Sequence, residues 1–430
     1  MKSIFYFSVF LLFISNLNAA INLIKKENND SNTTLLVIGG IHGNEPGGYF
    51  APAVLATHYT IKTKNLWIVP NLNQESIIHF TRGIHGDMNR KFSYIKKHDK
   101  DKKIVEEIKK IILSKNVSLV LNLHDGHGFY RKDNEGSIFN PNAWGQTCVI
   151  DQCRLKECQQ YGNLNDIAIT IKDNINKKLL QKHHSFNVKN TKTKYEDEEM
   201  KLSLTYFAVT HNKPAFAIET SKNLSSLSQK VFYQLVAIEE YMKIMGIDYS
   251  RDFDLNQDSI AKIIKSYGTL EINHNILLNL CDIKKSLSYI PIKSKSNEFN
   301  FSNPLGEIRK VKGRYLVYIA NKLLTRLKPQ YFKLSDNCQA TYEMEVDGKK
   351  VLAPKASEIF VNDDFKISKS NSYRVNVIGF YKKGKSDESD IRISYRDLNK
   401  KYSVDKQKKV YRVEFYKKNK FCSMIMVHFK

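Results

Sequence analysis

The chain has 430 residues, 42% hydrophobic and 26% charged, an ordinary composition that excludes a largely disordered protein. At roughly 150 residues per domain, this length predicts two or three domains. The 68 Lys and Arg residues against 44 Asp and Glu give a net charge of +24, which favours anionic partners. Because the basic residues are spread along the chain without a nucleic-acid-binding motif, we expect an anionic extracytoplasmic polymer as partner and no nucleic acid. A solvated Lys-rich surface accounts for much of the same charge.

The first twenty residues have the pattern of a signal peptide. Lys2 supplies a positive charge, residues 4–14 form an apolar run too short to span a bilayer comfortably, and Ala19 and Ala20 offer a cleavage site. No later apolar run is long enough to cross a membrane. We therefore expect an exported, periplasmic protein with no membrane span after cleavage of residues 1–20.

Between residues 33 and 245, predicted strands alternate with predicted helices. Apolar, β-branched runs predict buried strands at 33–40, 65–72, 117–124 and 213–220. Helices are predicted at 46–59, after a Pro-Gly turn, and at 102–114, 166–182 and 224–245. The alternation predicts an α/β fold, a mostly parallel sheet with helices on both faces. Ligands of such sheets bind outside the carboxyl ends of the strands.

Past residue 248 the helical periodicity fades, and short strand-like runs follow one another. The segment Val346-Asp347-Gly348-Lys349 has the composition of a hairpin turn. These runs predict about 180 residues of antiparallel β structure, in two small domains that meet near Asp336. The expected division is therefore a catalytic domain at 21–247, followed by β domains at 248–336 and 337–430.

A turn rich in glycine follows the first predicted strand and carries His42 and Glu45. A separation of three residues on a tight turn or first helical turn points both side chains to one side. An imidazole and a carboxylate are suitable zinc ligands that leave positions for a second imidazole and a water. The sequence therefore predicts a metal site here, and the alternative is a capping Glu near an incidental His.

The third predicted strand ends at His124, where a ligand of an α/β sheet is expected. His124 supplies the second imidazole, and His127, slightly farther along, is the alternative ligand. Asp125 is placed to orient a ligand from outside the first coordination shell. A polar loop without function remains the simpler interpretation of this segment.

Two further groups suit the chemistry of an anionic substrate. Arg82, Asn89 and Arg90 lie in one short segment, and Arg grips a carboxylate with two donors or stabilises an oxyanion. Glu219 ends the apolar strand at 213–220, and beside a metal-bound water it would act as a general base. The alternatives are a solvent-exposed basic loop and a Glu that caps the next helix.

Three of the six cysteines, Cys148, Cys153 and Cys158, lie within eleven residues. In an oxidising compartment this spacing suggests a local disulfide, although the pairing cannot be read from sequence. A cysteine zinc site is disfavoured because the segment contains no CxxC motif.

These segments, in their order along the chain, resemble the carboxypeptidase A superfamily of zinc exopeptidases and its aspartoacylase-like relatives. The resemblance covers residues 33–245 and implies an enzyme with one Zn²⁺ per chain. It implies that His42, Glu45 and His124 bind the metal. It implies that Glu219 is the general base and that Arg82 stabilises the oxyanion. It also implies that Asn89 and Arg90 bind the substrate carboxylate.

Together with the signal peptide and the β-rich C-terminal part, the chain resembles the peptidoglycan DL-carboxypeptidases that set helical cell shape in Campylobacter- and Helicobacter-type bacteria. This resemblance implies release of meso-diaminopimelate from γ-D-glutamate, which trims the stem tripeptide to a dipeptide. It also implies a β-barrel-like domain and an immunoglobulin-like domain after the catalytic domain. Such enzymes can carry Gln as the first metal ligand, where this chain has His42. Trp144 is interpreted either as a wall of the substrate pocket or as a packing anchor of its loop.

The expected partners are peptidoglycan stem peptides and, through the β domains, other envelope proteins. Two other functions stay open at this point. One is an amidohydrolase of the aspartoacylase or succinylglutamate desuccinylase kind, against which export and the extra β domains argue. The other is a non-catalytic cell-wall-binding protein with a vestigial site.

Overall fold

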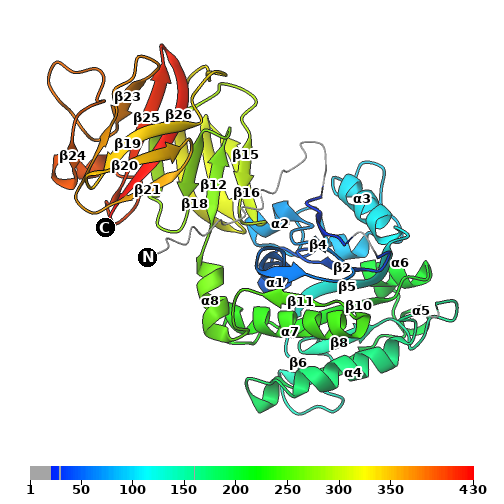
Figure 1. The fold of residues 1–430 in the computed structure, drawn as a ribbon. Helices are drawn as coiled ribbons and strands as arrows, with labels where there is room; N and C mark the ends of the chain where they lie inside the picture. Colours follow the sequence, from blue (N-terminus) through cyan, green and yellow to red (C-terminus); the bar gives the residue numbers. More distant parts are fainter. Residues whose placement is uncertain (1–20, 29–30, 159) are drawn as a thin grey trace. The chain divides into compact units, whose positions relative to one another are not determined.

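The computed structural model describes residues 21–28, 31–158 and 160–430 (Figure 1). These residues fall into two compact units, 21–265 and 266–430. The signal peptide predicted at 1–20 lies outside the described residues, and the domain boundaries expected at 247 and 336 stay a proposal. Within the described part of the chain, no helix combines the length and apolar character needed to cross a membrane.

A mixed sheet of seven strands forms the centre of the first unit, in the order β1-β4-β2-β5-β10-β8-β9. Its four central strands, β4, β2, β5 and β10, are parallel, whereas β1 and β8 pair antiparallel with their inner neighbours. The strands are β1 (Ile24–Lys26), β2 (Thr34–Ile38), β4 (Asn65–Val69), β5 (Val117–Gly126), β8 (Thr147–Ile150), β9 (Asn187–Asn190) and β10 (Ala215–Ser221). β2 and β4 are buried along their whole length, as expected for central strands covered on both faces.

Helices cover both faces of this sheet (Figure 1). α1 (Pro46–His58), α4 (Leu164–Asn176) and α7 (Leu227–Met245) pack together in one layer, and α3 (Lys102–Ile112) and α6 (Leu204–Thr210) form the other. In α7, the Ser226 side chain accepts a hydrogen bond from the Gln229 backbone N–H, and Gly246 ends the helix at a φ of 66°. The predicted mostly parallel sheet covered by helices is thus confirmed.

The shorter elements of this unit lie in the connections. They are β3 (Tyr59–Ile61), α2 (Gln74–His79), β6 (Phe129–Tyr130), β7 (Phe139–Asn140), α5 (Thr193–Glu196) and β11 (Tyr249–Arg251), with single 3₁₀ turns at Met88–Arg90, Lys182–His184 and Met200–Leu202.

The first unit ends with α8 (Gln257–Lys265), a helix inside the region expected to be entirely β. That expectation is wrong for this segment. Ile260, Ile263 and Ile264 have helical spacing, but nine residues with two lysines give only a short periodic signal. α8 packs on α7 and α1, so tertiary contacts stabilise a helix that is too short to be stable alone.

The second unit is built of four β-sheets, with strand orders β13-β12-β15, β14-β18-β17-β16, β20-β19-β22-β24 and β21-β26-β25-β23. The first two sheets contain β12 (Thr269–Ile272), β13 (Ile276–Asn279), β14 (Ser286–Ile292), β15 (Phe299–Phe301), β16 (Gly306–Val311), β17 (Arg314–Ile319) and β18 (Lys322–Tyr331). The other two contain β19 (Thr341–Val346), β20 (Lys349–Pro354), β21 (Glu358–Val361), β22 (Asp364–Ile367), β23 (Arg374–Val377), β24 (Ile393–Ser394), β25 (Val410–Lys417) and β26 (Lys420–Phe429).

Most strand pairs of the second unit are antiparallel, as predicted. The pairs β14–β18 and β21–β26 are parallel instead, because alternation of apolar residues is the same in both kinds of ladder and does not reveal direction. The predicted hairpin joins β19 to β20, where Asp347 and Gly348 both have positive φ angles, 49° and 77°. Two consecutive positive φ angles are the mark of a tight type I′ turn.

The last two sheets share one hydrophobic core, to which β19, β22, β25 and β26 all contribute. A disulfide joins Cys338 to Cys422 in this region. The local disulfide suggested for residues 148–158 is wrong, because Cys148, Cys153 and Cys158 are all free thiols. Spatial proximity, which determines the pairing, is set by the fold rather than by spacing along the chain.

The core of this sandwich gives a prediction of stability. Phe415 is 0% exposed and stacks on Tyr342 at a centroid distance of 3.7 Å. Replacing Phe415 with Ala should lower the free energy of unfolding of the sandwich by about 3–5 kcal/mol, through lost burial and a residual cavity. Denaturant unfolding followed by amide hydrogen exchange in β19 and β25 measures the loss in the sandwich itself, since both tryptophans lie in the first unit. Phe360, which is 60% exposed, is the matched control, and its Ala variant should unfold like the parent protein. Equal effects of the two substitutions would contradict this assignment of the core.

Candidate active site

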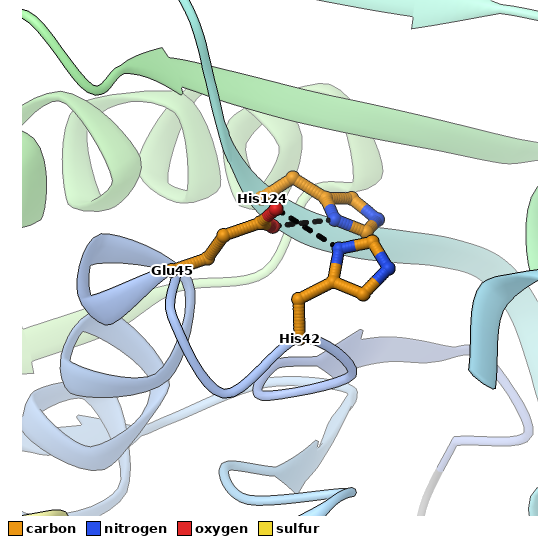
Figure 2. A group of neighbouring side chains, drawn as sticks. All are labelled: His42, Glu45 and His124. Atoms are coloured by element: carbon orange, nitrogen blue, oxygen red, sulfur yellow. Dashed lines mark hydrogen bonds and ion pairs between the residues drawn. The ribbon is translucent and has the colours of Figure 1, made fainter. Parts of the chain in front are cut away.

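The connection from β2 to α1 carries the first part of the site. Glycine is required at its start: a Cβ on Gly39 would lie 2.1 Å from the Gly48 carbonyl oxygen, and Gly40 has a φ of +71°. The chain thus turns sharply at the carboxyl end of β2, and Glu45 immediately precedes α1. This turn positions His42 and Glu45 on the side of the sheet to which β5 brings His124 (Figure 2).

Two imidazoles converge on one carboxylate at this edge of the sheet. His42 Nδ1 lies 3.0 Å from Glu45 Oε1, and His124 Nδ1 lies 2.9 Å from Glu45 Oε2 (Figure 2). The potential ligand atoms of the three residues all lie within 4.8 Å of one another, and all three side chains are buried. Two imidazoles and one carboxylate are a donor set of catalytic zinc sites and leave a coordination position for water. The three residues therefore fit a single metal ion.

The third member of this cluster is His124 rather than His127. His127 lines the same pocket, but it does not belong to the group of residues close enough to share one ion. His124 lies within β5 and is held in place by the sheet, whereas His127 follows the last residue of the strand. Because β5 is the neighbour of β2 in the sheet, a residue inside β5 such as His124 lies close to the turn that follows β2.

Asp87 holds the outer nitrogen of His42. Its Oδ1 lies 2.8 Å from His42 Nε2, and its Oδ2 accepts a hydrogen bond of 2.9 Å from Arg82 Nε. A carboxylate on the far nitrogen fixes the orientation of a metal-ligating imidazole and leaves the other nitrogen free for the metal. Sequence reasoning missed this role, since Asp87 is 45 residues from His42. The available signal was an acid inside the same short segment as Arg82, Asn89 and Arg90.

The charges around the cluster suit a cation. Burial opposes ionisation of Glu45, but the positive charge of His42 and the hydrogen bonds from both imidazoles lower the pKa of this carboxyl well below its usual range. Burial lowers the pKa of His124, which keeps this imidazole neutral and able to bind a metal. Burial also opposes protonation of His42, yet the carboxylates of Glu45 and Asp87 raise its pKa to about 9, so a metal ion bound at this ring has to displace a proton.

Glu219 provides a second carboxylate at the cluster. It lies in β10 directly beside His124 of β5 in the parallel ladder. Burial raises the pKa of the Glu219 carboxyl well above its usual range, and the negative charge of Glu45 raises it further. Glu219 is the one partly exposed residue of β10, and it lines the pocket with the metal-binding cluster. A carboxyl with these properties is suited to accepting and returning a proton.

A pocket of about 330 Å³ opens over the cluster. Arg82, Asn89, Arg90 and Trp144 all line it, so the structure brings every residue of the predicted site to one cavity. Asn89 is buried, and its Oδ1 accepts a hydrogen bond of 2.9 Å from the Leu204 backbone N–H, which fixes its position.

The other two lining residues of this group have contacts of their own. The Arg90 guanidinium lies 3.8 Å from the carboxylate of Glu199. The ammonium of Lys189 lies 4.3 Å from the ring centre of Trp144, over the indole face. The Trp144 indole therefore packs against the Lys189 ammonium and also forms part of the pocket wall.

Asp125 contacts a proposed ligand, since its backbone N–H donates a 3.2 Å hydrogen bond to Glu45 Oε2. Its Oδ2 accepts a 2.8 Å hydrogen bond from the Gly47 backbone N–H, and its Oδ1 accepts one from the hydroxyl of Thr220. A Cβ on Gly47 would lie 2.3 Å from this carboxylate. Asp125 therefore fastens the first turn of α1 to β5 and β10, and it positions Glu45 through the backbone rather than by holding a histidine ring.

A buried His–Glu–His cluster at the carboxyl ends of parallel strands, with a further carboxyl beside it and arginines in the pocket, defines a metal-dependent hydrolase. Comparison with known proteins is consistent with this class. A family model described as "carboxypeptidase controlling helical cell shape catalytic" matches residues 1–265, and one described as "C-terminal domain of metallo-carboxypeptidase" matches residues 335–430. The search of curated proteins returned no match.

Solved structures of the cell shape determinant Csd4 from Helicobacter pylori are similar over nearly the whole chain. The mDAP-bound form of Csd4, described as a D,L-carboxypeptidase, is 34% identical with a TM-score of 0.87, over 95% of this chain and 100% of that one. The tripeptide-bound form is 34% identical with a TM-score of 0.86 over the same shares. The chain therefore belongs to the family of carboxypeptidases that control helical cell shape, and it is a metallocarboxypeptidase.

Proposed function

We propose that this protein is a zinc-dependent DL-carboxypeptidase that trims the peptidoglycan stem tripeptide to a dipeptide by releasing meso-diaminopimelate from γ-D-glutamate. The observation that carries the proposal is the buried cluster of His42, Glu45 and His124 beside Glu219, in a pocket with two arginines. The similarity to Csd4, whose structures contain mDAP and a tripeptide, supports this choice of substrate.

In this proposal His42, Glu45 and His124 hold one Zn²⁺ per chain. When bound, zinc supplies a Lewis acid that polarises the scissile carbonyl and lowers the pKa of water. Asp87 keeps the proton on His42 Nε2, so that Nδ1 faces the ion. Zinc is favoured over harder cations because imidazole nitrogens supply two of the three ligands.

Glu219 moves the proton of the reaction. Its carboxylate accepts a proton from the attacking water and delivers it to the amine nitrogen of the departing diaminopimelate. Burial and the negative charge of Glu45 raise the pKa of the Glu219 carboxyl above its usual range, which makes its carboxylate a stronger base than an exposed one. Because Glu219 is partly exposed on the pocket wall, its carboxyl is accessible both to the attacking water and to the amine nitrogen of diaminopimelate.

The remaining pocket residues orient the substrate. Arg82, whose Nη1 lies 3.3 Å from Glu45 Oε1, stabilises the oxyanion that forms at the attacked carbonyl. Asn89 and Arg90 bind the terminal carboxylate of diaminopimelate, and Trp144 walls the pocket. Binding of that carboxylate makes the enzyme a carboxypeptidase, because an internal peptide bond offers no such group.

The substrate implies an exported, periplasmic protein whose partners are peptidoglycan stem peptides. The region at 335–430 matches a C-terminal domain that is separate from the catalytic one, and we propose that the β domains bind other envelope proteins or the wall itself. The excess of positive charge favours association with the anionic wall, and this effect should weaken as salt is added.

Mass spectrometry of reactions with synthetic tripeptide tests the proposed activity. The zinc-loaded protein should release diaminopimelate and the dipeptide, and a chelator should stop the reaction until zinc is restored. Cleavage of N-acylaspartate or succinylglutamate in place of the tripeptide would favour the amidohydrolase alternative. No zinc binding and no cleavage of any of these compounds would leave a wall-binding protein.

Asp87 gives a prediction about metal affinity. Asp87→Ala removes the partner of His42 Nε2 and frees the imidazole to rotate. We expect zinc affinity to fall by about 10- to 100-fold, the usual cost of losing such an outer partner. Competition with a chromophoric chelator measures the affinity. Asp87→Asn keeps an oxygen acceptor for the His42 N–H and should lose less, whereas unchanged affinity in the Ala variant would refute the positioning role.

A further inference from the structure

The pocket contains one cationic side chain that the proposed reaction leaves unused. Lys222 follows β10 and lines the pocket, together with two other Lys or Arg residues of the described lining, Arg82 and Arg90. Its ammonium nitrogen lies 3.5 Å from Glu45 Oε1, and its side chain is 35% exposed. A cation that is close to the metal-binding cluster and open to the pocket is available to an anionic group of a substrate.

Lys222 comes from a different wall of the pocket than the carboxylate-binding residues. Its backbone N–H donates a 2.7 Å hydrogen bond to the Gly126 carbonyl, which ties the loop after β10 to the end of β5. Arg82 and Arg90, by contrast, belong to the segment between α2 and α3. The two walls thus each present positive charge to the cavity.

The three cations differ in how far the protein already neutralises them. Arg82 binds Asp87 at 2.9 Å, and Arg90 lies 3.8 Å from Glu199. Within the described residues, the ion pair of Lys222 is with Glu45, which is itself a proposed metal ligand. A metal ion held by Glu45 would compete with Lys222 for the charge of this carboxylate and would leave the ammonium available to another anion.

The proposed substrate has such an anion on the acyl side. Because the scissile bond is formed by the side-chain carboxyl of D-glutamate, the α-carboxylate of that residue stays free. Four carbon–carbon bonds separate the two carboxyl carbons, a distance of about 5 Å when extended. A lysine has a flexible four-carbon stem that adapts to this separation while its backbone is held by the sheet.

Resting on the proposed function, we infer that Lys222 binds the free α-carboxylate of the D-glutamate residue and so makes the enzyme selective for substrates in which this group is not amidated. Asn89 and Arg90 then hold the leaving side of the substrate while Lys222 holds the acyl side, with the scissile carbonyl between them. Amidation of the α-carboxylate to D-isoglutamine removes the charge that Lys222 recognises without changing the cleaved bond.

A cycle that crosses enzyme variants with substrate variants tests this inference. The substrates are the tripeptide with D-glutamate and its D-isoglutamine counterpart, and the enzymes are the parent protein, Lys222→Met and Lys222→Arg. Met keeps an apolar stem of similar length but loses the charge, and Arg restores the charge. Lys110→Met, at an exposed position of α3 outside the pocket, controls for the loss of one positive charge. Zinc content is measured for every variant, since Lys222 contacts Glu45.

We expect the parent protein and Lys110→Met to prefer the D-glutamate substrate by about 10- to 100-fold in kcat/KM, the effect of one charge-assisted hydrogen bond. Lys222→Met should lose that preference by slowing on the D-glutamate substrate alone, and Lys222→Arg should keep much of it. Equal losses on both substrates, or no loss, would overturn the role of Lys222 while leaving the proposed function intact. No cleavage of either substrate by the zinc-loaded parent would refute the proposed function and this inference with it.

Discussion

Glu219→Gln should abolish tripeptide cleavage while the protein keeps its zinc. Gln preserves the size of the side chain and its place beside His124 in the ladder, but it neither accepts nor returns a proton. General acid–base catalysis contributes about 10²- to 10⁴-fold, and one residue serves both steps here, so kcat should fall by at least about 1,000-fold. Because Glu219 is not among the three clustered ligands, the zinc content should stay near that of the parent protein.

Kinetics and elemental analysis on the same preparation check both parts of this result. Glu106→Gln, an exposed position on α3, is the matched control for loss of a glutamate charge and should behave like the parent protein. Residual cleavage within tenfold of the parent rate would remove Glu219 from its role as proton carrier. Loss of zinc together with activity would instead make Glu219 a ligand.

His124→Ala should remove both zinc and activity. The substitution takes away one of two imidazoles and leaves Glu45 Oε2 without its 2.9 Å partner. A direct ligand contributes more to zinc affinity than a residue that only hydrogen-bonds a ligand. Loss of the latter costs up to roughly 100-fold in affinity, so the loss for His124→Ala should be larger. Elemental analysis after dialysis against buffer with a weak chelator gives the measurement.

His127→Ala is the sharpest control for this prediction. His127 lines the same pocket three residues further on, but it lies outside the cluster that shares one ion. The His127 variant should keep its zinc under conditions in which the His124 variant has lost it. The reverse pattern would show that the metal is held by a different set of residues.

The central sheet could be predicted from the sequence because its strands are buried on both faces. β2 and β4 are continuous apolar, β-branched runs, and α1 and α7 begin close to where their turn signals lie. The candidate ligands could be placed for the same reason, since each lies at the carboxyl end of a predicted strand. The rule that parallel strands end at the same edge of a sheet was sufficient to predict that residues 42, 45, 124 and 219 lie together at that edge.

What the sequence did not reveal depends on distances between separate segments. The contact of Asp87 with His42 follows from how two loops approach each other. The pairing of Cys338 with Cys422 spans 84 residues and is set by the sandwich. α8 and the two parallel pairs of the second unit are likewise fixed by packing, which a local pattern of apolar residues does not encode.

Anomalous diffraction at the zinc absorption edge, from crystals of the zinc-loaded protein, locates the metal and checks the assignment of its three ligands. We expect one strong peak per chain, within about 2.0–2.2 Å of Nδ1 of His42, Nδ1 of His124 and a carboxylate oxygen of Glu45. Absence of a peak between these three side chains, or a principal peak at the free cysteines of residues 148–158, would contradict it.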